Sequence, residues 1–182
     1  MVESKKPQGV SNMPEIIDLY NNARQVVGVA DKSQPIPDGL NKLVTHVWII
    51  NKRGQFLLQQ RAASSKMFPN MWGQTGGAAQ TGEDSWQCCA RETHEELGIT
   101  IDSDKSVWIG TFKRPNDFVD VWVVRADFDI ADLKLQADEV QDVKWATKSE
   151  IDELIDTGLF VPSALLGLQM VYSYFDLLKN YK

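Results

Sequence analysis

The chain has 182 residues, of which 43% are hydrophobic and 24% charged, as is typical of one globular domain. Its formal net charge of −6, without a basic block, argues against a protein that binds nucleic-acid polymers. No apolar run approaches the roughly 20 residues that span a membrane, and the polar start lacks the core of a signal peptide. We therefore expect a cytoplasmic protein that works without a membrane.

The predicted elements begin after a polar segment, residues 1–14, which we expect to be disordered. Two apolar runs on either side of Asn21 and Asn22 predict a β-hairpin over 15–30. Runs rich in β-branched and aromatic residues predict five further strands, at 43–50, 55–61, 106–113, 118–128 and 139–147. The first two of these strands are expected to form a second hairpin.

Three helices are predicted, at about 84–97, 148–158 and 162–181. Gly98 marks the end of the first helix. Thr147 or Ser149 is expected to cap the second, and Pro162 lies in the first turn of the third. Helices and strands interleave without a regular repeat, which predicts an α/β fold with a mixed sheet covered by helices.

The only cysteines, Cys88 and Cys89, are adjacent in the first predicted helix. Neighbouring cysteines rarely bridge each other, because the geometry is strained. Since no third cysteine completes a metal or redox site, we expect two reduced thiols in a cytoplasmic protein.

The same helix carries three glutamates, Glu92, Glu95 and Glu96, at spacings that place them on one side. Its apolar stripe lies on another face and comprises Trp86, Cys89, Ala90, Thr93 and Leu97. Like charges three and four residues apart repel one another on a helix. The carboxylates therefore form a solvated helix face or surround a cation.

A glycine-bearing loop leads directly into this helix. Gly77 is followed by five residues and Glu83, and seven more residues lead to Arg91 and Glu92. Glycine allows the phosphates of a substrate to approach closely, and Mg²⁺ typically takes one or two carboxylates together with phosphate oxygens and water. The order of loop and helix therefore favours a cation over a solvated face.

Residues 77–99 resemble the signature of the Nudix hydrolase family. That signature is Gly, five residues, Glu, seven residues, Arg-Glu, a hydrophobic residue, any residue, Glu-Glu, any residue, Gly and a hydrophobic residue. All seven fixed positions match, at Gly77, Glu83, Arg91, Glu92, Glu95, Glu96 and Gly98. The one departure is Thr93 at a hydrophobic position, and its methyl group can still face the core.

The resemblance implies the family's fold, an α/β/α sandwich in which a mixed β-sheet is flanked by helices. We therefore expect a single Nudix hydrolase domain over 15–182, with an N-terminal β-hairpin and a C-terminal helix. Either of these two elements is available for a homodimer, so the oligomeric state stays open.

The resemblance also implies a magnesium site, with manganese as the alternative ion. The expected metal ligands are Glu92, Glu95 and Glu96, assisted by Glu83. Arg91 is expected to orient a glutamate through an ion pair. The ion neutralises a diphosphate and lowers the pKa of a bound water.

A carboxylate near that water takes its proton. Glu95 and Glu96 on the helix are candidates for this base. Glu139 is another, because the family often has a glutamate before the strand predicted at 139–147. We rank the helix first.

Residues 53–72 resemble the corresponding stretch of the isopentenyl-diphosphate isomerases, a branch of the same superfamily. An Arg and a Lys of that stretch grip a diphosphate; Arg61 matches the Arg, and Lys66 falls near the Lys. Alternatively, Arg61 is a strand-end residue that snorkels over the sheet. Phe68 and Trp72, in the loop beside the signature, are candidates for stacking on a substrate.

Isomerase chemistry itself is disfavoured. The isomerases have a cysteine immediately before the signature glycine and a metal-binding histidine after it, whereas this chain has Gly76 and Ala78 there. Because the glutamates are intact, we expect Gly76 and Gly77 to form the substrate loop of a hydrolase.

The expected activity is Mg²⁺-dependent hydrolysis of a diphosphate bond in a nucleoside diphosphate linked to another group X, or in a similar small diphosphate. Isomerase-like activity or hydrolysis of a prenyl diphosphate is one alternative. A non-catalytic nucleotide-binding domain is another, against which the complete signature argues.

Overall fold

The computed structural model describes residues 14–180, so the expected disorder of residues 1–14 lies outside the described part except at Pro14. The strands are β1 (Ile16–Tyr20), β2 (Val26–Asp31), β3 (Lys42–Ile50), β4 (Phe56–Arg61), β5 (Trp72–Gly73), β6 (Ser106–Arg114), β7 (Asp117–Arg125) and β8 (Val140–Ala146). The α-helices are α1 (Ser85–Leu97), α2 (Lys148–Asp156) and α3 (Leu165–Asn180), and 3₁₀ turns cover Ser103–Lys105, Ile130–Asp132 and Pro162–Ala164. Every predicted helix and strand is present, with boundaries shifted by a few residues.

The main sheet has the strand order β5-β4-β3-β7-β6, and β8 pairs along β4. β3 and β7 are parallel over their whole length, from Lys42 opposite Asp117 to Ile50 opposite Arg125, whereas the other pairs are antiparallel. The predicted hairpin of β3 and β4 is held by a single residue pair, Ile50 and Phe56. The rest of that side of β3 is therefore open to another segment.

The loop after β5 takes this free side of β3. The Thr45 N–H donates to the Gly77 carbonyl at 2.9 Å, and the Val47 N–H donates to the Thr75 carbonyl at 2.9 Å. Gly76 lies between them with a φ of 137°, and a Cβ built there would fall 2.1 Å from the Thr45 carbonyl oxygen. Only glycine permits this close approach of loop and strand.

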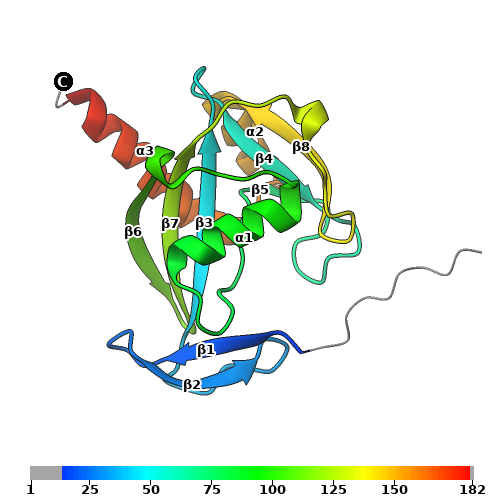
Figure 1. Cartoon of the computed structure of the whole chain (residues 1–182). Helices are drawn as coiled ribbons and strands as arrows, with labels where there is room; N and C mark the ends of the chain where they lie inside the picture. Colours follow the sequence, from blue (N-terminus) through cyan, green and yellow to red (C-terminus); the bar gives the residue numbers. More distant parts are fainter. Residues whose placement is uncertain (1–13, 181–182) are drawn as a thin grey trace, which may run out of the picture.

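The sheet separates two helical layers (Figure 1). α1 covers one face, where Val47 and Ile49 of β3 are buried together with Leu97. α2 and α3 cover the other face, where Trp48 is buried with Leu168. Alternate residues of β3 thus enter two cores, as expected of a strand that is buried on both faces. The arrangement confirms the predicted α/β/α sandwich.

α1 begins at a capping box, in which Asp84 and Gln87 each accept a hydrogen bond from the backbone N–H of the other. It ends at Gly98, which adopts the left-handed conformation with φ of 71°. Although the helical wheel separates the glutamates from the apolar stripe, Glu92 and Glu96 are buried, with exposed fractions of 6% and 2%. The loop after β5 covers them, which a wheel cannot predict.

The predicted N-terminal hairpin is confirmed as a separate two-stranded sheet, β1–β2. At its tip, the Arg24 guanidinium donates to both carboxylate oxygens of Asp120, a β7 residue that is 1% exposed. Within β1, the Asp18 carboxylate accepts from the Gly82 N–H at 3.0 Å. The hairpin is therefore attached both to the main sheet and to the loop that enters α1.

Thr147, one of the two predicted caps, caps α2 through a hydrogen bond from the Glu150 N–H at 3.3 Å. Pro162 begins a 3₁₀ turn, and the last α-helix starts at Leu165, later than predicted. Within residues 14–180, no helix combines the length and the apolar character needed to cross a membrane.

Candidate active site

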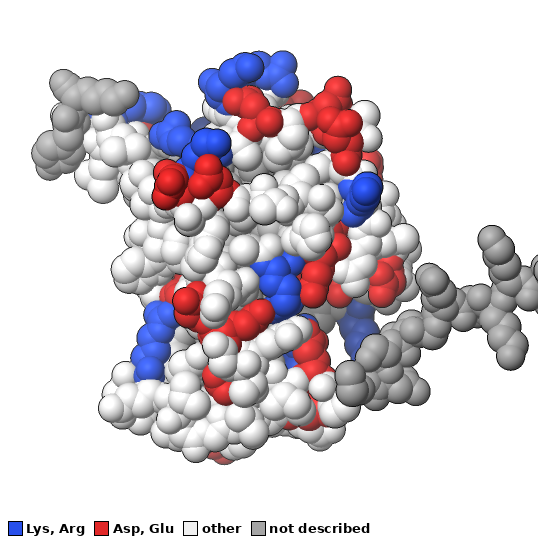
Figure 2. All heavy atoms as spheres, in the orientation of Figure 1, with Lys and Arg blue, Asp and Glu red and all other residues white. Residues whose placement is uncertain are grey.

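Arg91, in the middle of α1, holds three carboxylates. Its Nε donates to Glu83 at 2.6 Å and its Nη2 to the second oxygen of Glu83 at 3.0 Å, while Nη1 donates to Glu92 at 2.9 Å and to Glu95 at 2.8 Å. Nη2 also donates to the Ala78 carbonyl at 3.0 Å. Figure 2 shows basic and acidic side chains side by side over the middle of α1, on a face without an extended basic surface.

The Glu92 carboxylate lies directly against the backbone of Gly77. A Cβ built on Gly77 would fall 2.3–2.6 Å from the carboxylate atoms of Glu92, so any side chain at this position would displace that carboxylate. This contact explains physically why a glycine stands at the start of the acidic segment.

The Glu96 carboxylate is held by three neutral donors. Gln59 Nε2 donates to Oε2 at 3.1 Å, the Gly76 N–H donates to Oε2 at 3.2 Å, and the Thr75 hydroxyl donates to the same oxygen. In the described part of the chain, Oε1 accepts no hydrogen bond and no Lys or Arg contacts Glu96. One oxygen is thus fixed and the other is left available.

Burial makes the ionisation of Glu92 and Glu96 unfavourable. Burial, together with the charges of Glu92 and Glu139, raises the pKa of Glu96 to about 8 against the opposing hydrogen bonds from Thr75 and Gly76. Burial also raises the pKa of Glu92, although Arg91 opposes the shift. A cation bound between these carboxyls would remove the free-energy cost of ionising both.

Glu139 reaches the site through the loop between β7 and β8. The Gln136 N–H donates to the Glu96 carbonyl at 3.1 Å, and the Ala62 N–H donates to the Glu139 carbonyl at 2.8 Å, so the loop is held on both α1 and β4. The exposed Glu139 carboxylate accepts one long hydrogen bond, from Gln136 Nε2 at 3.4 Å. The structure therefore brings Glu139 to the Glu96 side of the site.

Lys32, directly after β2, is a residue that the sequence analysis missed. Its Nζ pairs with Glu15 at 2.7 Å, and Gln80 donates to the other oxygen of Glu15 at 3.2 Å. Burial disfavours the charge on Lys32, but Glu15 and the more distant Glu92 and Glu139 outweigh this and raise its pKa. No local motif signals this residue, because the hairpin brings it to the site from outside the signature.

Arg61 and Lys66, predicted to grip a diphosphate, lie at the end of β4 and in the loop beyond it. Arg61 is opposite Val140, the neighbour of Glu139, in the β4–β8 pair. Its Nε donates to the Met67 carbonyl at 2.9 Å, and its Nη groups make no hydrogen bond to any residue from 14 to 180. Lys66 is exposed. Of the two cations, Arg61 is the one that the fold positions.

The two aromatic candidates do not lie beside Glu96. Trp72 is opposite Gln60 in the β4–β5 pair, so its side chain lies on the other sheet face from Gln59, which contacts Glu96. Lys144 Nζ lies over the Trp72 ring, 4.4 Å from its centroid. Phe68 packs against the core of the α2–α3 layer. A strand of only two residues shows no alternation of polar and apolar side chains, so the sequence could not predict which sheet face Trp72 occupies.

The expected metal ligands are close together but are not gathered as a ready-made cluster. Across residues 14–180, no three Asp, Glu, His or Cys side chains form a metal-binding group. Glu92 and Glu95 share Arg91, whereas Glu96 faces neutral donors. The donor set nevertheless fits a hard divalent cation in its chemistry, because all its oxygens are carboxylate oxygens and Oε1 of Glu96 is unbonded.

Both cysteines are buried and free, as predicted. Burial raises the pKa of the Cys88 thiol to about 12, and burial also raises the pKa of the Cys89 thiol. Both thiols are therefore protonated and unreactive at neutral pH.

Comparisons with known proteins agree with the site. A profile of the NUDIX domain matches residues 40–162. An uncharacterized Nudix hydrolase of Listeria monocytogenes is 36% identical over 152 residues, which cover 82% of this chain and 90% of that protein. The isopentenyl-diphosphate Delta-isomerase of Escherichia coli is 32% identical over 138 residues, covering 72% of this chain and 76% of that protein. The solved structure of DR0079 from Deinococcus radiodurans has a TM-score of 0.73 at 25% identity and covers 86% of this chain and 99% of that one.

The matched segment runs from just before β3 to the turn after α2. It contains α1 with Arg91 and Glu96, the loop that covers them, and Glu139, but neither the N-terminal hairpin nor α3. The chain therefore belongs to the Nudix family of hydrolases, and it is an enzyme that acts on phosphorus-containing anhydrides.

Proposed function

We propose that the chain hydrolyses, in the cytoplasm, the diphosphate bond of a nucleoside diphosphate linked to another group X, or of a similar small diphosphate. Mg²⁺ is the proposed ion, with Mn²⁺ as the alternative. The observation that carries the proposal is the Glu96 carboxyl, which is buried beside Glu92 and bonded only to neutral donors. Such a group costs free energy when ionised unless a cation neutralises it.

Glu92, Glu95 and Glu96 would hold the ion. When bound, the ion supplies charge neutralisation at the diphosphate and polarises the phosphorus centre. The chain's own part is orientation: Arg91 fixes Glu92 and Glu83, and the donors on Oε2 fix Glu96 while leaving Oε1 available.

A carboxylate that takes a proton from the attacking water should accept few hydrogen bonds, because each such bond lowers its proton affinity. Glu96 accepts three, and Glu95 accepts one from Arg91 at 2.8 Å. Glu139 is exposed and accepts one long bond. These contacts favour Glu139 over the helix that the sequence ranked first. A larger loss of kcat in Glu95→Gln than in Glu139→Gln would instead indicate that a glutamate of α1 takes the proton from the attacking water.

Two cations support the binding of a diphosphate. Arg61 presents free Nη groups next to the Glu139 segment, and Lys32 lies within the field of Glu92 and Glu139. Arg and Lys at these places would neutralise phosphate oxygens that the metal does not reach. Gly77 places backbone, and no side chain, against the Glu92 carboxylate.

The first test is a substrate panel. The purified chain is offered nucleoside diphosphates, dinucleotides, sugar nucleotides and prenyl diphosphates, each with Mg²⁺, Mn²⁺ or EDTA. We expect release of phosphate or monophosphate from at least one class, and only with a divalent ion. Turnover that EDTA leaves unchanged would contradict the proposed ion dependence.

The second test is Glu96→Gln, which keeps the shape and removes the charge. We expect turnover to fall by about two to four orders of magnitude, as for the loss of a metal or electrostatic contact in a transition state. Glu153→Gln, an exposed glutamate on α2, is the matched control and should keep full activity. Near-normal activity of Glu96→Gln in a folded protein would contradict the proposed role of Glu96 as a metal ligand.

Isomerisation of a prenyl diphosphate is the second candidate, favoured by the 32% identity to the Escherichia coli isomerase. Against it stand Gly76 and Ala78 at the positions of the isomerase cysteine and histidine, and the high pKa of the buried Cys88 thiol. Interconversion of isopentenyl and dimethylallyl diphosphate by the purified chain would overturn the preference for hydrolysis.

A further inference from the structure

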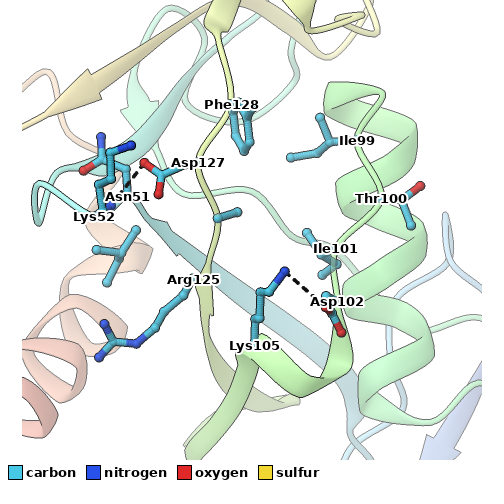
Figure 3. Close-up of a pocket in the computed structure, with 12 residues that line it drawn as sticks. Asn51, Lys52, Ile99, Thr100, Ile101, Asp102, Lys105, Arg125, Asp127 and Phe128 are labelled. Atoms are coloured by element: carbon cyan, nitrogen blue, oxygen red, sulfur yellow. Dashed lines mark hydrogen bonds and ion pairs between the residues drawn. The ribbon is translucent and has the colours of Figure 1, made fainter.

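A cavity of ≈ 630 Å³ lies at the carboxyl ends of β3 and β7, away from the Glu96 contacts (Figure 3). Its walls are the residues that follow each strand, Asn51–Lys52 and Ala126–Phe128, together with the segment 99–102 after α1. The Ala126 N–H donates to the Ile50 carbonyl at 3.1 Å and ties the two strand ends together. In open α/β sheets, ligands commonly bind outside the carboxyl ends of parallel strands.

The floor of the cavity is apolar and rigid. Ile50 and Ile101 are buried, with exposed fractions of 5% and 8%, and Ile99 and Phe128 lie on two facing segments. The Phe128 ring packs against Trp145 with 5.1 Å between ring centroids, which fixes its position. A volume of this size with an apolar floor and a polar rim is typical of a small-molecule site.

The rim carries an excess of positive charge in an otherwise acidic chain. Lys52, Lys105 and Arg125 line the cavity together with two acids, Asp102 and Asp127. Lys105 pairs with Asp102 at 3.3 Å, and both side chains are about half exposed or more, so the pair is weak. Asp127 accepts from the Lys52 N–H at 3.3 Å. An incoming anion can therefore compete for the ammonium groups of Lys52 and Lys105.

Backbone donors are also available along one wall. The N–H groups of residues 99–102 donate to no acceptor within residues 14–180, although the N–H groups of the preceding Gly98 and of Asp104, two residues beyond, are both bonded. Backbone groups without a protein partner are bonded by water or by a ligand.

We propose that this cavity is a second ligand site, separate from the active site, for a small organic phosphate with a planar or apolar body. The body would lie on Ile101 and Phe128, and the phosphate would bind Lys105 and Lys52. The site shares no residue with the Arg91 network or with the donors on Glu96. Its occupation therefore does not depend on the proposed hydrolytic activity.

The test is a titration of the full ¹⁵N-labelled chain, kept metal-free with EDTA, with adenosine 5′-monophosphate followed by amide NMR spectra. We expect saturable shifts at residues 99–102 and 126–128. Lys105→Glu should weaken the binding by about tenfold or more, equivalent to about 1.4 kcal/mol. Lys148→Glu, an exposed lysine on α2 outside this cavity, is the matched control and should bind normally.

Two further titrations separate the parts of the ligand. Inorganic phosphate alone and adenosine alone should each bind more weakly than the monophosphate, because the proposal assigns affinity to both the rim and the floor. Equal binding of inorganic phosphate, shifts confined to α1 and residues 75–77, or normal binding by Lys105→Glu would each overturn the proposal.

Discussion

Two neighbouring regions of α1 differ in how the charge of a buried carboxylate is balanced. Around Arg91, three glutamates share one guanidinium, so part of their charge is compensated within the chain. One turn further along, Glu96 is also buried, but among residues 14–180 it is bonded only to neutral groups. The first region thus has an internal cation, whereas the second has no positively charged partner among residues 14–180. This difference identifies where the fold leaves room for an added cation.

Arg91→Ala should destabilise the Arg91 network strongly. The buried Glu92 would lose its cation, and we expect the free energy of unfolding to fall by about 3–5 kcal/mol, measured by urea denaturation. Glu95→Gln removes a half-exposed partner of the same guanidinium and should cost less than about 1 kcal/mol. Similar losses in the two variants would mean that burial does not set the strength of this network.

The second prediction concerns pH and the metal-free protein. Burial raises the pKa of Glu96 in the folded chain to about 8, above its ordinary 4.5. Between these values the unfolded chain has lost the proton and the folded chain keeps it, so stability falls as pH rises. We expect a loss on the order of 3 kcal/mol between about pH 5 and about pH 8, measured by urea denaturation in EDTA.

Glu96→Gln is the control for this pH dependence. The variant cannot ionise and should lose most of the slope, with a remainder from Glu92, whose pKa burial also raises. An unchanged slope in Glu96→Gln would place the titrating group elsewhere.

The third prediction concerns Thr75, one of the neutral hydrogen-bond donors to Glu96. Thr75→Val removes one donor to Glu96 Oε2 and should lower kcat about tenfold, because a lost hydrogen bond to a charged group costs about 1.5 kcal/mol. The acidic limb of the pH–activity profile should move to higher pH, since this hydroxyl lowers the pKa of Glu96. Thr75→Ser keeps the hydroxyl and should restore both; equal defects in the two variants would assign Thr75 a packing role.

The smallest expected effect is that of Lys32→Ala. Lys32 is about one-third exposed, so its charge is screened, and we expect KM to rise only about two- to fivefold with little change in kcat. Because the effect is electrostatic, added salt should reduce it. Lys148→Ala is the control. An equal KM in both variants would show that Lys32 does not contribute to substrate binding.

Much of the fold follows from local signals in the sequence. The β-branched runs, the capping residue Thr147 and the left-handed Gly98 depend on residues close together in the chain. The seven signature residues likewise lie within a single loop and helix. Local chemistry is therefore enough to locate these elements and the acidic segment.

The contacts that complete the site are long-range and could not be predicted in the same way. Glu96 is buried because the loop after β5 bonds to β3, and Gln59 comes from a different strand. Lys32 belongs to the N-terminal hairpin, which lies outside the signature. Trp72 faces the other side of the sheet because of its pairing register with β4, which is defined only in the folded chain. Periodicity assigns a face to each residue but not the segment that will cover it.

The N-terminal hairpin also affects how far the chain could be shortened. The segment shared with the family begins at residue 40, yet Arg24 lies before it and neutralises Asp120, which is 1% exposed in β7. A chain trimmed to the shared segment would leave that carboxylate with the Thr111 hydroxyl but without its cation, which should destabilise the fold. We therefore expect the unit that folds to be larger than the segment recognised in the sequence, and the N-terminal hairpin to be needed in any minimal form of this enzyme.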